Sequence, residues 1–277
     1  MTPTQLFEQI QRKHSFLCAG LDADMAKTPE HLRSAANPIF EFNRAIIDAT
    51  HHVAVAYKPN TAFYEAHGTL GWEALEQTVG YIKQHHPEIM VIADAKRGDI
   101  GNTAKMYARA FFERMDCDAI TLSPYMGHDS VEPYLEYPNR WAILLGITSN
   151  LGYADFQTIE NKETGLRLFE EVLQRSAQWG GADRLMYVVG ATRPDYLKAV
   201  RRVAPNHFLL VPGVGAQGGR LDDVARHGMN RQCGLLVNSS RSIIYADTGR
   251  RFAEAARCAA VELQGQMQQQ LQQAGLI

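Results

Sequence analysis

Three charged residues in strand-like segments are the best candidates for chemistry in this sequence. Asp94 and Lys96 lie two positions apart in an apolar run, so their side chains should point to the same side of a strand. Lys58 has the same alternation as the small residues Ala54 and Ala56, which suit a crowded interior. We therefore expect Lys58, Asp94 and Lys96 to converge. Buried charges persist only when they are paired, so this cluster is either a catalytic site or a structural ion-pair network.

A second candidate site is a glycine-rich segment further along the chain. Gly213, Gly215 and Gly218 match the spelling GxGxxG. A dinucleotide site of this type follows a first strand and has an acidic residue about 20 positions later, and neither condition is met here. Glycines also let backbone N–H groups approach an anion, and the guanidinium of Arg241 adds a fork of donors. The favoured interpretation is a phosphate-binding site, and the alternative is a tight turn.

The elements that must position these residues follow a regular alternation. Eight short apolar or β-branched runs are predicted as strands, at residues 16–22, 53–59, 89–96, 119–123, 141–148, 185–190, 208–214 and 234–238. Apolar residues at three- and four-residue spacing predict helices between them, at residues 39–49, 72–84, 103–115, 165–179, 195–203 and 220–227. The connection 125–137 is the least regular, because Pro133 interrupts it.

This alternation predicts an α/β fold with parallel strands and right-handed crossovers. Eight such units in about 250 residues are the size of a (β/α)8 TIM barrel, and a doubly wound open sheet is the alternative. Residues 249–277 are predicted to form a C-terminal helix that packs on the barrel through Leu263, Met267 and Leu271 and then frays in a Gln-rich end. We expect one domain over residues 1–277.

Composition limits the possible classes of protein. The chain has 277 residues, of which 45% are hydrophobic and 21% charged, with a formal net charge of −2. These values are typical of a globular protein and argue against a nucleic-acid or membrane-surface partner. Membrane-length apolar runs and a secretory signal are not apparent. The four cysteines form no CxxC pair, which favours a reduced, cytoplasmic protein without a zinc site.

The segment Asp94–Thr103, DAKRGDIGNT, resembles the DxKxxDI signature of the orotidine 5′-phosphate decarboxylase family. The resemblance extends over roughly residues 10–250 and includes LD at 21–22, YKP at 57–59, TS at 148–149, VPGVGAQGG at 211–219 and SRS at 240–242. Related phosphate-binding barrels, such as hexulose-phosphate synthase and keto-gulonate phosphate decarboxylase, have a similar motif. They resemble metal-using enzymes with an acidic residue where this chain has Lys58, so Lys58 favours the decarboxylase.

The resemblance implies decarboxylation of orotidine 5′-phosphate to UMP, the last step of de novo pyrimidine biosynthesis, without a cofactor or a metal. Asp22 and Lys58 would hold the ribose hydroxyls. Asp94 would lie beside the substrate carboxylate, and Lys96 would donate a proton to the ring carbon that loses CO2. Ile100 would line the apolar side of the pocket.

The resemblance also implies contacts further from the reacting carbon. Asp99 and Thr103 would reach into the neighbouring subunit's site, which makes the protein a homodimer. The other implied substrate contacts are Ser149 at the pyrimidine edge, Gln217 and Arg241 at the phosphate, and Pro212, Gly218 and Ser240. The long stretch 150–181 and the sequence Asn-Ser-Ser before Arg241 resemble the longer branch of the family.

Such a reaction leaves charge on a ring carbon, and the sequence has no flavin, pyridoxal or metal motif to accept it. An alternating array of Lys58, Asp94, Lys96 and Asp99 of a second subunit would supply preorganised charge instead. Three alternatives stay open: a metal-dependent sugar-phosphate aldolase or decarboxylase, a Schiff-base aldolase that uses Lys58 or Lys96, and a non-catalytic binding barrel. Arg97 has no assigned role, and a solvent-facing position is its simplest interpretation.

Overall fold

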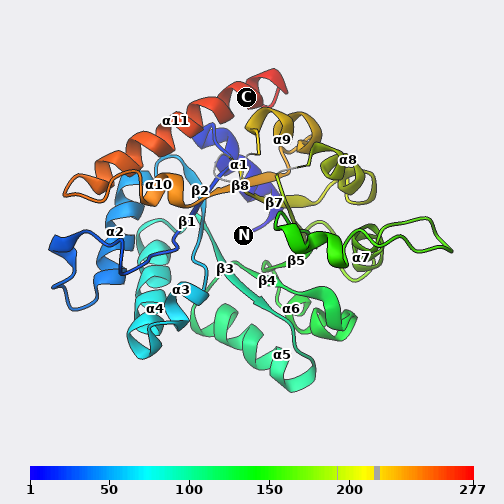
Figure 1. Cartoon of the computed structure of the whole chain (residues 1–277), viewed down its shortest axis with the longest axis horizontal. Coiled ribbons are helices and arrows are strands. Elements are labelled where there is room, and N and C mark those ends of the chain that lie inside the picture. The colour runs from blue at the N-terminus through cyan, green and yellow to red at the C-terminus, as the bar shows by residue number, and fades with distance from the viewer. Residues whose placement is uncertain (192, 215–218) are drawn as a thin grey trace.

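Eight parallel strands close into a barrel in chain order, with helices around it (Figure 1). The computed structural model describes residues 1–191, 193–214 and 219–277. The strands are β1 (Leu17–Gly20), β2 (Ala54–Lys58), β3 (Met90–Arg97), β4 (Ala119–Leu122), β5 (Trp141–Ile147), β6 (Leu185–Val189), β7 (Phe208–Pro212) and β8 (Leu235–Ser239). Pairing of β1 with both β2 and β8 closes the cylinder. The predicted (β/α)8 barrel and all eight predicted strands are confirmed.

Most helices form the outer ring of Figure 1, whereas α1 lies close to the barrel axis in this view. They are α1 (Pro3–Lys13), α2 (Pro38–Thr50), α3 (Ala62–Glu65), α4 (Gly68–His85), α5 (Gly101–Ala108), α6 (Glu132–Leu135), α7 (Leu168–Ser176), α8 (Pro194–Val203), α9 (Leu221–Gly228), α10 (Arg241–Ile244) and α11 (Phe252–Gln273). Short 3-10 turns are η1 (Glu30–Leu32), η3 (Pro124–Met126), η4 (His128–Ser130) and η5 (Leu151–Asp155). Each of the six predicted helices matches one of these, with shifted ends.

Two connections differ from the regular pattern. The predicted helix 103–115 is α5 followed by a π-helical segment, η2 (Arg109–Arg114). The irregular connection 125–137 contains only η3, η4 and the four-residue α6, which has Pro133 in its first turn. Proline fits the first turn of a helix because its missing N–H has no partner there. The helix that follows β3 therefore continues with a π-helical pitch, and the helical turns that follow β4 are short.

The two ends of the chain pack together: the Gln11 side chain of α1 donates from Nε2 to the carbonyl of Leu276 at 2.9 Å. Helix α1 was not predicted, and its Lys13 ammonium donates to the carbonyls of His51 (2.7 Å) and Ala54 (2.8 Å). Met267 and Leu271 of α11 are fully buried, as the predicted apolar face requires. The expected fraying is wrong, because α11 stays helical to Gln273.

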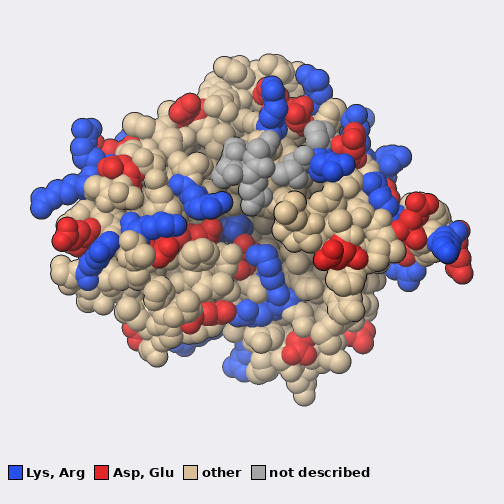
Figure 2. Space-filling view, in the orientation of Figure 1, with Lys and Arg blue, Asp and Glu red and all other residues tan. Residues whose placement is uncertain are grey.

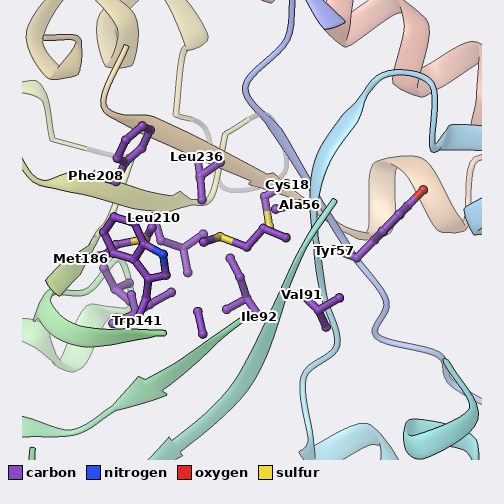
Figure 3. Packing of buried hydrophobic residues seen from close by; sticks show 14 of the residues in the cluster. Cys18, Ala56, Tyr57, Val91, Ile92, Trp141, Met186, Phe208, Leu210 and Leu236 are labelled. Carbon is purple, nitrogen blue, oxygen red and sulfur yellow. The ribbon is translucent and has the colours of Figure 1, made fainter. Parts of the chain in front are cut away.

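The barrel interior follows the alternation of each strand. Cys18, Ala56 and Ile92 lie on the inner side, whereas Tyr57 and Val91 point outward (Figure 3). Side chains two positions apart share a face of a strand, so Lys58 continues the inward series of Ala56 and Asp94 continues that of Ile92. The strands thus carry both charges to the same end of the barrel.

Within the described part of the chain, no helix is both long and apolar enough to cross a membrane. The four cysteines are free thiols, three of them buried.

Candidate active site

A cavity of about 380 Å³ opens where the strands end. Figure 2 shows the mouth of the barrel as a central hollow in which basic and acidic side chains meet. Eight of the residues predicted from the sequence line this cavity: Asp22, Lys58, Asp94, Lys96, Ser149, Pro212, Ser240 and Arg241. Its wall also includes the apolar side chains of Leu145, Val188 and Leu210. Apolar walls exclude water and strengthen electrostatic interactions inside a site.

Asp94 is the centre of the charged cluster. Its Oδ2 accepts a hydrogen bond from Lys58 Nζ at 2.6 Å, and its Oδ1 accepts one from Lys96 Nζ at 2.6 Å. Asp94 and Lys58 are buried, whereas the Lys96 side chain is 48% exposed. The predicted convergence of these three residues is therefore confirmed. Because Lys96 is the member that reaches solvent, it is the one that a substrate can contact most directly.

The ionised state of this cluster follows from its geometry. Burial favours the neutral form of Asp94, but Lys58 and Lys96 hold the pKa of its carboxyl below the ordinary value. Burial likewise opposes the charge on Lys58, yet the carboxylates of Asp94 and Asp22 raise the pKa of this lysine above its ordinary value. Opposite charges within a few ångströms favour each other's ionised forms. The cavity is thus lined by preformed charges near neutral pH.

The backbone at Lys96 is unusual. Lys96 has φ +46°, in the left-handed region that a lysine rarely occupies. Such conformations persist when the surroundings over-determine them, and they gather at functional sites. The turn of the backbone here lets Lys96 Nζ fold back onto Asp94, two residues earlier in the chain.

Arg97 does not face solvent, contrary to the interpretation from sequence. Its side chain is 19% exposed and pairs with Glu65 of α3. The guanidinium also lies over the ring of Tyr107 at 5.1 Å and that of Phe111 at 5.7 Å. Guanidinium groups bind both carboxylates and aromatic faces. Arg97 therefore ties the end of β3 to α3 and to the α5–η2 segment, on the side of the strand opposite Lys96.

Asp22 places a buried carboxylate oxygen at the start of the β1 loop. Its Oδ1 is buried and, among the described residues, has no hydrogen-bond partner. The backbone carbonyl of Asp22 accepts from the Tyr245 hydroxyl at 3.1 Å, which fixes the loop. A buried acceptor without a partner is costly, so this oxygen is suited to a donor on a bound molecule.

The rim of the cavity needs glycine at two close approaches. A Cβ on Gly20 would lie 1.8 Å from Ser240 Oγ, and one on Gly190 would lie 3.0 Å from the backbone of Ser149. The absence of these side chains lets both loops enter the rim. Arg241 is exposed next to Ser240. The predicted contacts Gln217 and Gly218 lie outside the described residues.

Three predicted site residues lie elsewhere in this chain. Of the described residues, Asp99, Ile100 and Thr103 are not among those that line the cavity. Asp99 is half-buried, and its Oδ1 accepts from the N–H of Ile100 at 2.8 Å. Ile100 and Thr103 are exposed. A single chain thus brings together Lys58, Asp94 and Lys96 but leaves Asp99 outside the cluster.

Several polar residues of the site were not among those predicted from the sequence. Asn60, Asn150 and Asn238 line the cavity. The fully buried Thr121 donates to Asp94 Oδ1 at 2.9 Å. The asparagines follow or end strands, where the functional residues of such barrels gather, so their positions could have identified them, whereas nothing in the sequence marked Thr121. Over the described ranges, no group of three or more His, Cys, Asp or Glu side chains is placed to hold a metal ion.

A family model and two relatives match most of this chain. The sequence model described as "Orotidine 5′-phosphate decarboxylase / HUMPS family" matches residues 15–256. A protein named orotidine 5′-phosphate decarboxylase from Bacteroides fragilis is 57% identical over 271 residues, which are 98% of each chain. A protein of the same name from Parabacteroides distasonis is 57% identical over 277 residues, which cover 100% of this chain and 99% of the relative.

A solved structure is also similar to this chain over nearly its full length. The structure of Leishmania donovani OMP decarboxylase superposes with a TM-score of 0.83 at 36% identity, covering 98% of this chain and 99% of the other. The similarity therefore spans the barrel, the cavity and both ends of the chain.

Proposed function

The chain belongs to the orotidine 5′-phosphate decarboxylase / HUMPS family, and we propose that it converts orotidine 5′-phosphate to UMP and CO2 at the cavity around Asp94. The observation that carries this proposal is the Lys58–Asp94–Lys96 cluster, with both lysine nitrogens 2.6 Å from one carboxylate. Loss of orotidine 5′-phosphate absorbance on adding metal-free protein tests it. An unchanged absorbance would contradict the activity.

The chemistry divides between Asp94 and Lys96. The bond between the ring carbon and the carboxyl group breaks, CO2 leaves, and the electron pair stays on the ring carbon. Lys96 Nζ gives a proton to that carbon and recovers one from solvent. Asp94 beside the substrate carboxylate is a like-charge contact, which costs about 4 kcal/mol at ~4 Å and an effective dielectric of ~20. That repulsion falls as CO2 departs, so it lowers the barrier.

The same charges stabilise the carbanion without moving. Preorganised charges need no reorganisation when charge develops in the transition state. The Lys96 ammonium reaches the open cavity, and Lys58 supports it from the buried side of Asp94. The substrate is held away from the reacting carbon: Asp22 Oδ1 accepts from a ribose hydroxyl, Ser149 contacts the pyrimidine edge, and Arg241 binds the phosphate.

Arg241→Ala is expected to weaken UMP binding by about tenfold to a hundredfold, the range for a hydrogen bond to a charged group. Uridine, which lacks the phosphate, should bind the variant about as well as the wild type. Calorimetric titration with both ligands measures the difference. Arg231→Ala, at the opposite end of β8, is the matched control and should leave both affinities unchanged. Equal losses for UMP and uridine would contradict a phosphate role for Arg241.

The site is proposed to be completed by a second copy of the chain. Large apolar side chains are exposed on the segments after β3 and β4: Ile100 (45%), Met106 (57%), Tyr125 (94%) and Met126 (49%). Large apolar side chains that are exposed on neighbouring segments are typical of a protein interface. Asp99 and Thr103 belong to the same segments. A homodimer built on this surface would deliver Asp99 to the partner's cavity and finish the array of alternating charges.

Subunit exchange tests this arrangement. We expect Asp94→Asn and Asp99→Ala chains to be nearly inactive alone and to regain about a quarter of the wild-type activity when mixed. Random exchange makes half the dimers mixed, and one of the two sites in each mixed dimer has both aspartates. Asp94→Asn mixed with Lys96→Ala is the control and should regain nothing, because both residues act within one chain. Mixed chains that exchange without regaining activity would contradict the shared site.

We also propose that the protein works in a reducing compartment, the cytoplasm. Cys258 is a free cysteine on the surface, and exposed thiols stay reduced in such a compartment.

A further inference from the structure

The hydroxyl of Thr121 joins two parts of the charged cluster. Thr121 lies in β4, and its side chain is fully buried. The backbone N–H of Lys96 donates to Thr121 Oγ1 at 2.9 Å, and the Thr121 hydroxyl donates to Asp94 Oδ1 at 2.9 Å. One oxygen thus links the main chain of the lysine to the carboxylate that its ammonium contacts.

The pairing of β3 with β4 explains why a side chain is needed here. Ala93 pairs with Ile120, and the next pair is Arg97 with Leu122. Three residues of β3, 94–96, therefore face the single residue Thr121. Such a bulge interrupts the regular ladder and re-aims side chains. Thr121 Oγ1 supplies the Lys96 N–H with an acceptor at the point where the backbone turns to φ +46°.

The direction of these bonds makes the link specific. A hydroxyl that accepts from an N–H keeps its own hydrogen for a second partner, and here that partner is Asp94 Oδ1. The same oxygen accepts from Lys96 Nζ, while Oδ2 accepts from Lys58 Nζ. Asp94 is therefore held by three donors from three strands, which leaves its carboxylate little freedom to rotate.

We propose that Thr121 is a positioning residue for the decarboxylation: it fixes the left-handed backbone of Lys96 and the rotation of the Asp94 carboxylate relative to each other. The proposal rests on the proposed function, because it assigns a role through Asp94 and Lys96. Small displacements of a catalytic group cost much of its effect, since the groups must match the transition state closely. Thr121 acts behind the carboxylate, so it affects the chemical step more than substrate binding.

Thr121→Val tests the proposal, because valine keeps the shape and removes the hydroxyl. We expect kcat to fall about tenfold to a hundredfold, the range for loss of a hydrogen bond to a charged group, while KM for orotidine 5′-phosphate changes less than about threefold. Thr121→Ser, which keeps the hydroxyl, should retain kcat within about threefold of the wild type. Thr50→Val is the matched control: Thr50 is also fully buried, and its hydroxyl bonds Ile46 O and Tyr57 Oη outside the cavity. Its kcat should be unchanged.

A folded Thr121→Val enzyme with wild-type kcat would overturn the proposal, as would a Thr121→Ser enzyme as impaired as the valine variant. If Thr121→Val does not fold, Thr121→Cys carries the test, since a thiol of similar size is a weaker hydrogen-bonding group. The kcat of Thr121→Cys should be lower than that of Thr121→Ser. A kcat equal to that of the wild type would overturn the proposal. Wild-type protein without activity in the same assay would overturn the proposed function itself, whereas active wild type with an unaffected Thr121→Val enzyme would overturn only the role of Thr121.

Discussion

Lys96→Ala is expected to lower kcat by about 10⁴-fold or more while UMP still binds. The variant loses the proton donor, an effect worth about 10²- to 10⁴-fold in enzymes, and the cation nearest the open cavity, an effect worth about 10²- to 10³-fold. The fold should survive, because the Lys96 side chain is 48% exposed and Asp94 keeps its buried partner Lys58. Initial rates with orotidine 5′-phosphate and calorimetry with UMP measure the two properties separately.

Two further variants separate the roles of charge and proton. Lys96→Arg keeps a cation at the site but holds its proton too tightly to donate it, so it should be nearly as impaired as the alanine variant. Lys198→Ala removes an exposed lysine from α8 and should leave kcat unchanged. If Lys96→Ala kept more than about a tenth of kcat, a general acid at this position would be contradicted.

The fold could be predicted from sequence because a parallel barrel repeats one strong signal. Each strand is a short apolar run, buried on both faces, and each is followed by a helical pattern. Helix α1 was missed although its signal was present: Thr2 and Gln5 form a capping box and Pro3 begins the helix. The π-helical segment η2 had no such signal, because its buried residues Phe111 and Phe112 follow a spacing that also fits an ordinary α-helix.

The candidate site could be predicted where side-chain alternation alone decides direction. Lys58, Asp94 and Lys96 lie together as expected, because the alternation of side chains points all three inward and their strands are adjacent. Thr121 could not be found this way, because its contacts depend on the bulge between β3 and β4. Arg97 was misjudged for a similar reason: beyond the bulge, its direction is set by Glu65 and the rings of α5 and η2.

Replacing Asp94 by asparagine is expected to destabilise the chain by about 3 kcal/mol at pH 7 and to abolish measurable turnover. Removing one member of a buried ion pair leaves the other charge uncompensated, which costs about 3–5 kcal/mol. Lys58 is that charge, with its side chain 6% exposed, whereas Lys96 can turn to solvent. We expect the lower end of the range for this reason. Urea unfolding at constant protein concentration measures the free energy of unfolding.

The double variant Lys58→Met, Asp94→Asn is the matched control. It removes the isolated charge, so it should be more stable than Asp94→Asn alone. If the two changes were simply additive, the destabilisation would not come from an uncompensated Lys58.

The pH dependence gives this prediction a definite sign. The pKa of Asp94 is lowered in the folded chain, where burial is outweighed by Lys58 and Lys96. Its carboxylate therefore adds stability that is fully present above the unfolded-state pKa of about 3.9 and is lost as the pH falls below that value. Asparagine does not titrate, so the stability difference between wild type and Asp94→Asn should shrink between about pH 5 and pH 3. A difference that stayed constant over this window would show that Asp94 acts by shape and hydrogen bonding rather than through its charge.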